Sequence, residues 1–277
     1  MNNTIGVLIN YTKGMDLVAK FREAQEMGLG SCQLCIWDET LYRDENAREV
    51  KAALDETGFV ISTVWAGWDM PREWNAIYGP ATIGLVPEAY RESRAKALVA
   101  ASRFAEIIGV KYIATHVGFL PSDAMDPKFV GTVAALRYVC GEMRKRGQTF
   151  LFETGQETPM AVVRAIEAIG TGNCGINFDT ANLILYGNGN SLDALEMFGK
   201  YVLDTHIKDG FYPTNTTDNG KQAPVGEGIA NIPAIIKRLH ELGYEGPMTI
   251  EREISGEQQK KDIAAARDLI IKWMAEA

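Results

Sequence analysis

The chain has 277 residues, of which 46% are hydrophobic and 23% charged, and its formal net charge is −8. This balance indicates a globular protein, and we expect one domain over residues 1–277 because no linker or composition shift divides the chain. The negative charge argues against a nucleic-acid partner, and no apolar run approaches the ~20 residues that cross a membrane. The first residues lack the segments of an export signal, so we expect a cytoplasmic protein that acts on a small molecule.

Eight short apolar runs alternate with longer amphipathic stretches along the chain. The runs begin at residues 5, 32, 60, 112, 149, 174, 202 and 248, and each has the length of a buried strand. The amphipathic stretches include residues 16–28, 92–109, 129–147 and 231–243. Predicted helices end at Gly28, Gly58, Gly109, Gly147 and Gly243, because a glycine in the left-handed conformation commonly terminates a helix.

This alternation predicts a parallel sheet covered by helices, and eight strand-helix units predict a closed (β/α)8 TIM barrel. A doubly wound open sheet is the alternative. We favour the barrel because polar residues follow many different strands, whereas an open sheet concentrates its site at one switch point. Two long loops, 69–90 and 210–228, follow the third and seventh strands. They are candidate lids over the rim, with surface insertions of no function as the alternative.

Four side chains that bind metals stand at the ends of the last four predicted strands. Glu153 ends TFLFE, Asp179 ends GINFD, His206 ends VLDTH and Glu251 ends PMTIE. A single acid at a strand end is more often a loop charge or a helix cap. Four in order favour a metal site, because the carboxyl ends of parallel strands meet at one rim. Carboxylates with one imidazole suit a divalent ion such as Mn, Mg, Co or Fe better than structural zinc.

The motifs around these residues resemble a known family. They are LFETGQE (151–157), NFDTANL (177–183), THIKDG (205–210), PVGEG with NIP (224–233) and TIERE (249–253). Across essentially the whole chain they resemble the xylose isomerase-like TIM barrels. The similarity is to the sugar phosphate isomerase/epimerase family, the relatives of D-tagatose 3-epimerase and hydroxypyruvate isomerase.

The resemblance implies a site and a reaction. Glu153, Asp179, His206 and Glu251 would bind one divalent ion, Mn first, with Mg, Co, Fe and Zn as alternatives. Glu153 and Glu251 would also serve as the catalytic base and acid. The function implied is a metal-dependent sugar or sugar-phosphate isomerase or epimerase that transfers a proton through a metal-stabilised enediolate. Homodimers or homotetramers are common in such barrels.

Two departures from the epimerase pattern leave the sugar open. Asn182 stands where the epimerases carry a histidine, and Lys208 is the cation near the place where they carry an arginine. One alternative function is a lyase or hydrolase that eliminates the leaving group of a 3-keto-glycoside, and another is a catalytically silent sugar-binding barrel. An endonuclease-like phosphodiesterase would need three metals and more than the three histidines present.

Six further residues are candidates for substrate binding. Two of them have specific alternative roles: the histidine that ends YIATH could satisfy a backbone group, and Lys208 could pair with Glu227 or another acid of the rim. The two tryptophans could be packing residues. The candidates are His116, Glu157, Asn182, Lys208, Trp65 and Trp68.

Overall fold

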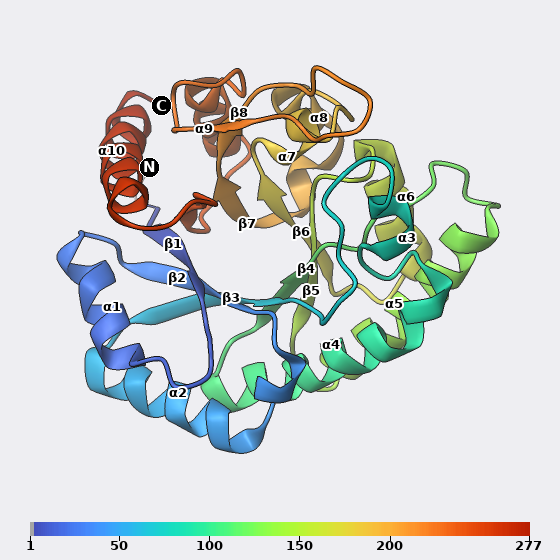
Figure 1. Ribbon diagram of the computed structural model, residues 1–277, viewed down its shortest axis with the longest axis horizontal. Helices are drawn as coiled ribbons and strands as arrows, with labels where there is room; N and C mark the ends of the chain where they lie inside the picture. Colours follow the sequence, from blue (N-terminus) through green and yellow to red (C-terminus); the bar gives the residue numbers. More distant parts are fainter. Residues whose placement is uncertain (1–2) are drawn as a thin grey trace.

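A computed structural model describes residues 3–277 and contains a closed barrel of eight parallel strands (Figure 1). Around the barrel the order is β1-β10-β7-β6-β5-β4-β3-β2, and β1 pairs with β10. This closure confirms the predicted barrel and excludes the open sheet. The strands are β1 (Ile5–Asn10), β2 (Ser31–Ile36), β3 (Val60–Ala66), β4 (Tyr112–Thr115), β5 (Thr149–Glu153), β6 (Cys174–Asp179), β7 (Val202–Ile207) and β10 (Met248–Ile250).

Helices surround the barrel, and their apolar faces pack against the outside of the strands (Figure 1). Predicted terminators are confirmed at Gly58 and Gly109, which end α2 and α4 with φ of 65° and 80°. In the described part of the chain no helix is long and apolar enough to cross a bilayer. The longer helices are α1 (Leu17–Glu26), α2 (Asp44–Thr57), α4 (Glu88–Ile108), α5 (Pro127–Arg144), α6 (Pro159–Ile169), α8 (Ser191–Phe198), α9 (Ile232–Glu241) and α10 (Glu257–Glu276). The short ones are η1 (Glu39–Leu41), α3 (Gly79–Thr82), α7 (Asn182–Leu185) and η2 (Gly199–Tyr201).

Two environments result from the alternation of side chains along each strand. Outward side chains join the helices in a large apolar core, whose fully buried members include Phe21, Phe104 and Phe198. Inside the barrel lies a polar layer, in which Thr63 Oγ1 donates a 2.6 Å hydrogen bond to Asp204 Oδ2. Buried polar groups are stable only when they are hydrogen-bonded, so this layer has defined partners across the barrel.

The long loop after β3 is fastened to α4 by one arginine. Buried Arg94 donates hydrogen bonds to the carbonyl oxygens of Pro71, Thr82 and Gly84 at 2.6–2.8 Å. Its guanidinium also stacks on Trp68, 4.9 Å from the ring centroid. The base of this loop is therefore fixed to the barrel shell.

The long loop after β7 contains a short antiparallel pair that sequence periodicity did not predict, β8 (Asp209–Gly210) with β9 (Gln222–Ala223). Asp209 organises this loop, since its carboxylate accepts backbone hydrogen bonds from Gly226, Gly228 and Ala230. The two long loops also touch. The Ala76 amide donates to the Thr217 carbonyl at 3.1 Å, and Asn219 Nδ2 donates to the Trp74 carbonyl at 3.2 Å. Their contact lies at the carboxyl-end rim, where the ligand candidates are.

Candidate metal centre

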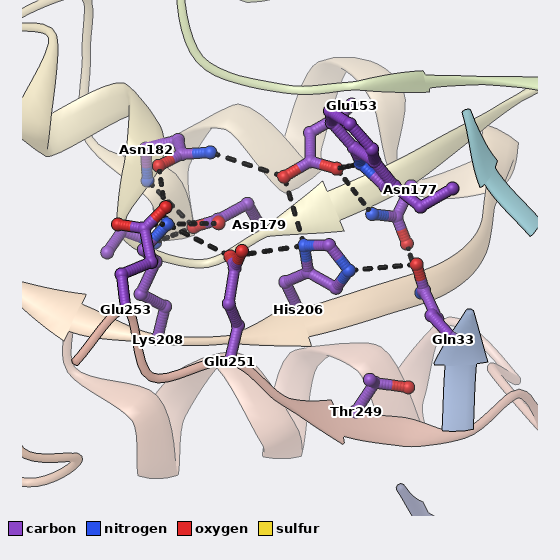
Figure 2. A network of polar contacts seen from close by, with 12 residues as sticks. Gln33, Glu153, Asn177, Asp179, Asn182, His206, Lys208, Thr249, Glu251 and Glu253 are labelled. Atoms are coloured by element: carbon purple, nitrogen blue, oxygen red, sulfur yellow. Dashed lines mark hydrogen bonds and ion pairs between the residues drawn. The ribbon is translucent and has the colours of Figure 1, made fainter. Parts of the chain in front are cut away.

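The four ligand candidates meet at the carboxyl end of the barrel, as Figure 2 shows. They come from β5, β6 and β7, which are neighbours, and from the residue that follows β10, the other neighbour of β7. All four are buried, and one ligand atom from each lies within 4.8 Å of the others. His206 is central. Its Nδ1 lies 2.9 Å from Glu153 Oε1 and 3.2 Å from Glu251 Oε2.

Asp179 is held in place by the start of α7. Its Oδ1 accepts hydrogen bonds from the backbone amides of Ala181 and Asn182, both at 2.8 Å. Its Oδ2 accepts no hydrogen bond, and the Lys208 ammonium lies 3.4 Å away. Burial raises the pKa of Asp179 to about 8. One buried carboxylate oxygen thus faces a cation without accepting a hydrogen bond, and such an oxygen suits a cation ligand.

Charges in the cluster oppose the effect of burial. Burial alone would lower the pKa of His206, but the carboxylates of Glu153 and Glu251 outweigh it and hold that pKa well above its ordinary value. Burial likewise works against ionised Glu251, yet Lys208 and His206 keep its pKa well below the usual range. A proton on His206 is therefore favoured where the two glutamates converge. The same position has the charge environment that a divalent cation needs.

Lys208 is a buried cation beside the four ligands. Its Nζ donates to Glu251 Oε2 at 2.9 Å and to Asn182 Oδ1 at 3.3 Å, and it lies 3.2 Å from Glu253 Oε2. The rim acids that it pairs with are thus Glu251 and Glu253 rather than Glu227. Because Asp179 and Glu251 are themselves ligand candidates, Lys208 is placed to donate to an oxygen of a molecule bound there.

A cavity of about 850 Å³ opens at this rim. Four of the six substrate-binding candidates line it, namely His116, Asn182, Lys208 and Trp65. Trp65 Nε1 donates a hydrogen bond to Glu153 Oε2. His116 Nδ1 has no hydrogen-bond partner, and burial lowers the pKa of this imidazole. A neutral imidazole with a free nitrogen can bind a substrate hydroxyl.

The other two substrate-binding candidates do not line the cavity. Trp68 is 2% exposed and packs in a cluster with Trp65, Ile83 and Arg94, behind the lining. Glu157 is also 2% exposed, and neither of its carboxylate oxygens has a hydrogen-bond partner. Burial raises the pKa of Glu157 to about 8, so its neutral form is favoured near neutral pH.

Three residues near the centre were not candidates on sequence grounds. Trp74, in the loop after β3, lines the cavity, and its ring lies 5.4 Å from that of His116. No periodic pattern marks a residue of an irregular loop. Gln33 and Asn177 lie inside the barrel beside His206 and Glu153. The sequence could have identified Gln33 and Asn177, because each is a polar residue in the middle of an apolar run, SCQLCI and CGINFD respectively.

Comparison with known proteins gives one family. The sequence profile described as "Xylose isomerase-like TIM barrel" matches residues 21–273. Among curated proteins, an uncharacterized protein of Methanocaldococcus jannaschii is 27% identical over 97 residues, which are 35% of this chain. The matched part covers 31% of the length of that relative.

Solved structures match over nearly the whole chain. A xylose isomerase domain protein from Planctomyces limnophilus has a TM-score of 0.91 and 32% identity, with 99% of each chain covered. A 3-keto-D-glucoside 4-epimerase from E. coli has a TM-score of 0.71, 20% identity and full coverage of both chains. A xylose isomerase-like protein from Mycobacterium smegmatis, in complex with magnesium, has a TM-score of 0.73 and 16% identity, and 99% of this chain and 97% of that chain are covered. The last two show the shared fold.

Proposed function

Because the chain belongs to the xylose isomerase-like TIM barrel family, we propose that it is a divalent-metal-dependent isomerase or epimerase of sugars or sugar phosphates. The observation that carries the proposal is the buried cluster of three carboxylates and one imidazole, with ligand atoms within 4.8 Å of one another. One protein of the same fold is a sugar epimerase, and we extend that class of reaction to this chain.

The residues that would hold the ion are Glu153, Asp179, His206 and Glu251. Oxygen and imidazole ligands in this ratio fit Mn or Mg, with Co, Fe and Zn as alternatives. Oδ2 of Asp179 supports the fit, because this buried carboxylate oxygen accepts no hydrogen bond and already faces a cation, the Lys208 ammonium, at 3.4 Å. When bound, a divalent ion supplies Lewis-acid polarisation of a carbonyl and its neighbouring hydroxyl.

Glu153 and Glu251 are the proposed base and acid. Their strands, β5 and β10, are separated in the barrel by β6 and β7, so the two carboxylates approach the centre from different sides. One glutamate removes the proton next to the substrate carbonyl. If the other returns a proton to the opposite face of the same carbon, the product is an epimer. If a proton is returned to the neighbouring carbon, the product is an aldose-ketose isomer.

Three neighbouring residues would orient the sugar. The Lys208 ammonium can donate to an oxygen that becomes negative during proton transfer. Asn182 bridges Lys208 and Glu153, with its Nδ2 3.4 Å from Glu153 Oε1. His116 offers its free nitrogen to a hydroxyl. The proposal therefore gives Lys208 and His116 partners in the substrate, and Asn182 holds Lys208 beside Glu153.

Elimination from a 3-keto-glycoside is the second candidate, and the size of the cavity favours it. At roughly 30 Å³ for each water-sized group, the 850 Å³ cavity holds about twice the non-hydrogen atoms of one hexose. A glycoside has a second ring or group to fill the remaining volume. The same base would remove the proton, and the bond to the leaving group would then break.

The test combines metal content with proton exchange. Wild type, Glu153→Gln and Glu251→Gln would be loaded with Mn²⁺, and their metal content would be measured. They would then be incubated in deuterated water with ketoses, ketose phosphates and 3-keto-glycosides. We expect one ion in the wild type and deuterium at one substrate carbon, with exchange reduced about 100-fold or more in each variant. Glu227→Gln, at an exposed loop position, is the matched control and should exchange like the wild type.

The outcomes separate the candidates. Deuterium in an epimer or an aldose supports proton transfer alone, whereas release of the leaving group supports elimination. A wild type that binds no ion would contradict the metal centre. If the wild type binds one ion but exchanges no proton with any of these compounds, the result would favour the alternative of a catalytically silent sugar-binding barrel.

A further inference from the structure

Gln33 is a buried side chain of the half of the barrel that contributes no metal ligand. It lies on β2 with no exposed surface, and its amide extends across the interior to β7 (Figure 2). There Gln33 Oε1 lies 2.8 Å from Nε2 of His206, the ring nitrogen that points away from the carboxylate cluster. Gln33 Nε2 lies 2.8 Å from Asn177 Oδ1 on β6.

Asn177 continues the chain to a second ligand. Its Nδ2 donates a 3.0 Å hydrogen bond to Glu153 Oε2. Two side-chain amides therefore join the back of His206 to the outer oxygen of Glu153. The oxygen that remains, Glu153 Oε1, is the one that faces His206 Nδ1 at 2.9 Å.

The hydrogen bonds in this chain can run in one direction only. A ligating carboxylate accepts hydrogen bonds and donates none, so Asn177 must present its NH₂ to Glu153. Its oxygen then faces Gln33, which must donate through Nε2. The oxygen of Gln33 is left for His206 Nε2, which must carry a hydrogen. His206 Nδ1 is thereby the nitrogen that offers a lone pair to a cation.

We propose that Gln33 is a positioning residue of the metal centre, which fixes the Nε2–H form of His206 and, through Asn177, the orientation of Glu153. The inference rests on the metal site of the proposed function. It assigns to β2 a part in metal binding that the four ligands do not reveal. Partners of ligating side chains typically change metal affinity 10- to 100-fold when they are removed.

The test compares two buried polar positions of the barrel interior. Gln33→Met keeps the approximate shape of the side chain and removes both hydrogen bonds. Thr63→Val is the matched control, because Thr63 is equally buried and its hydrogen bond goes to Asp204. We expect calorimetric titration with Mn²⁺ to give a Kd weakened 10- to 100-fold in Gln33→Met. In Thr63→Val the Kd should stay within about threefold of the wild type, with thermal stability lowered in both variants.

A second measurement reports the hydrogen itself. In the Mg²⁺-loaded wild type, nitrogen-15 NMR of histidine should show a protonated Nε2 on His206 whose hydrogen exchanges slowly with water. In Gln33→Met this hydrogen should exchange faster. A residue that only fills the interior would leave both the exchange and the Kd unchanged, and that result would overturn the proposal.

The design also covers a failure to fold and a failure of the proposed function. If Gln33→Met does not fold, Gln33→Asn replaces it, because its shorter polar side chain does not reach His206; the same loss of affinity is expected. A wild type without metal affinity would contradict the metal centre itself. A folded Gln33 variant that binds Mn²⁺ as tightly as the wild type does would contradict only the role of Gln33.

Discussion

The two halves of the barrel build opposite walls of one cavity with different chemistry. On the side of β2, β3 and β4, the wall is largely aromatic, with Cys35, Trp37 and Trp65 along it, His116 after β4 and Trp74 at the mouth. On the side of β5 to β10, the strand ends carry the acids and bases. An apolar wall excludes water and strengthens the electrostatic interactions of the charged wall. The difference separates a half that shapes the cavity from a half that carries the proposed metal ligands.

Gln33 connects the halves, as Thr63 and Trp65 also do through their hydrogen bonds to Asp204 and Glu153. It comes from the aromatic side and its hydrogen bonds end on His206 and, through Asn177, on Glu153. The separation of roles is thus incomplete, because Trp65 of the lining and Gln33 of the interior both bond to residues of the charged half. Four substitutions test how far the separation extends.

The largest effect is expected from Trp68→Ala, which removes a 2% exposed side chain from the aromatic half. Loss of a buried tryptophan leaves a cavity, so the free energy of unfolding should fall by about 3–5 kcal/mol. If the halves are separate, the Mn²⁺ affinity of the folded variant should change less than tenfold. Denaturant unfolding and calorimetric titration measure the two quantities. A loss of Mn²⁺ binding free energy as large as the loss of stability would contradict the separation of the two halves.

Asp179→Asn is the reciprocal change in the charged half. The asparagine oxygen can still accept the two backbone hydrogen bonds at the start of α7, but its NH₂ replaces the carboxylate oxygen that faces Lys208. We expect Mn²⁺ affinity to fall about 100-fold, or ~2.7 kcal/mol. The metal-free variant should be less stable than the wild type, because the buried Lys208 ammonium loses the carboxylate that lies 3.4 Å from it. An unchanged Mn²⁺ affinity would contradict the role of Asp179.

Glu157→Gln asks whether the charged half lowers stability. Burial raises the pKa of Glu157 to about 8, so the folded chain keeps a proton that the unfolded chain loses above its ordinary pKa near 4.5. The contribution of Glu157 protonation to the free energy of unfolding is therefore fully present below about pH 4.5 and is lost as the pH rises toward 8. Glutamine has no proton to lose. In metal-free protein the stability advantage of the variant should grow by about 1.4 kcal/mol from pH 6 to pH 7. A constant difference in urea unfolding would contradict the buried, neutral Glu157.

Trp74→Ala should have the smallest effect. Trp74 is 36% exposed, so the free energy of unfolding should change by less than about 1 kcal/mol. Its ring is part of the cavity wall, and the loss of an aromatic contact with substrate should raise KM about 2- to 10-fold with little change in kcat. Steady-state kinetics on the substrate identified by proton exchange would measure it. A fall in kcat as large as the rise in KM would instead indicate that Trp74 takes part in the reaction step.

The sequence predicted the parts of the molecule that repeat. Apolar runs of strand length gave the eight strands, and a ligand type at the end of each of the last four gave the cluster of Glu153, Asp179, His206 and Glu251. An ion pair between Lys208 and an acid of the rim was predicted, but the acids are Glu251 and Glu253 rather than the named Glu227. Distances between loops do not follow from spacing along the chain.

Other features depend on contacts across the fold. The two-residue strands β8 and β9 are too short to show a period. The approach of Gln33 to His206 joins residues 173 positions apart, so no local pattern contains it. The burial of Trp68 behind the cavity rather than in it depends on how the loop after β3 folds back onto α4. Such features need the closed barrel before they can be seen.

The hydrogen bonds between the two long loops couple their motion. The amide of Ala76 and the side chain of Asn219 join the two loops, so neither loop can move away without breaking its bond to the other. Each hydrogen bond contributes only about 0.5–1.5 kcal/mol, and together they favour the joined state roughly tenfold to a hundredfold. Two bonds of that strength would keep the loops joined for most of the time. The side of the cavity that Trp74 and Asn219 line would therefore open as one unit rather than loop by loop.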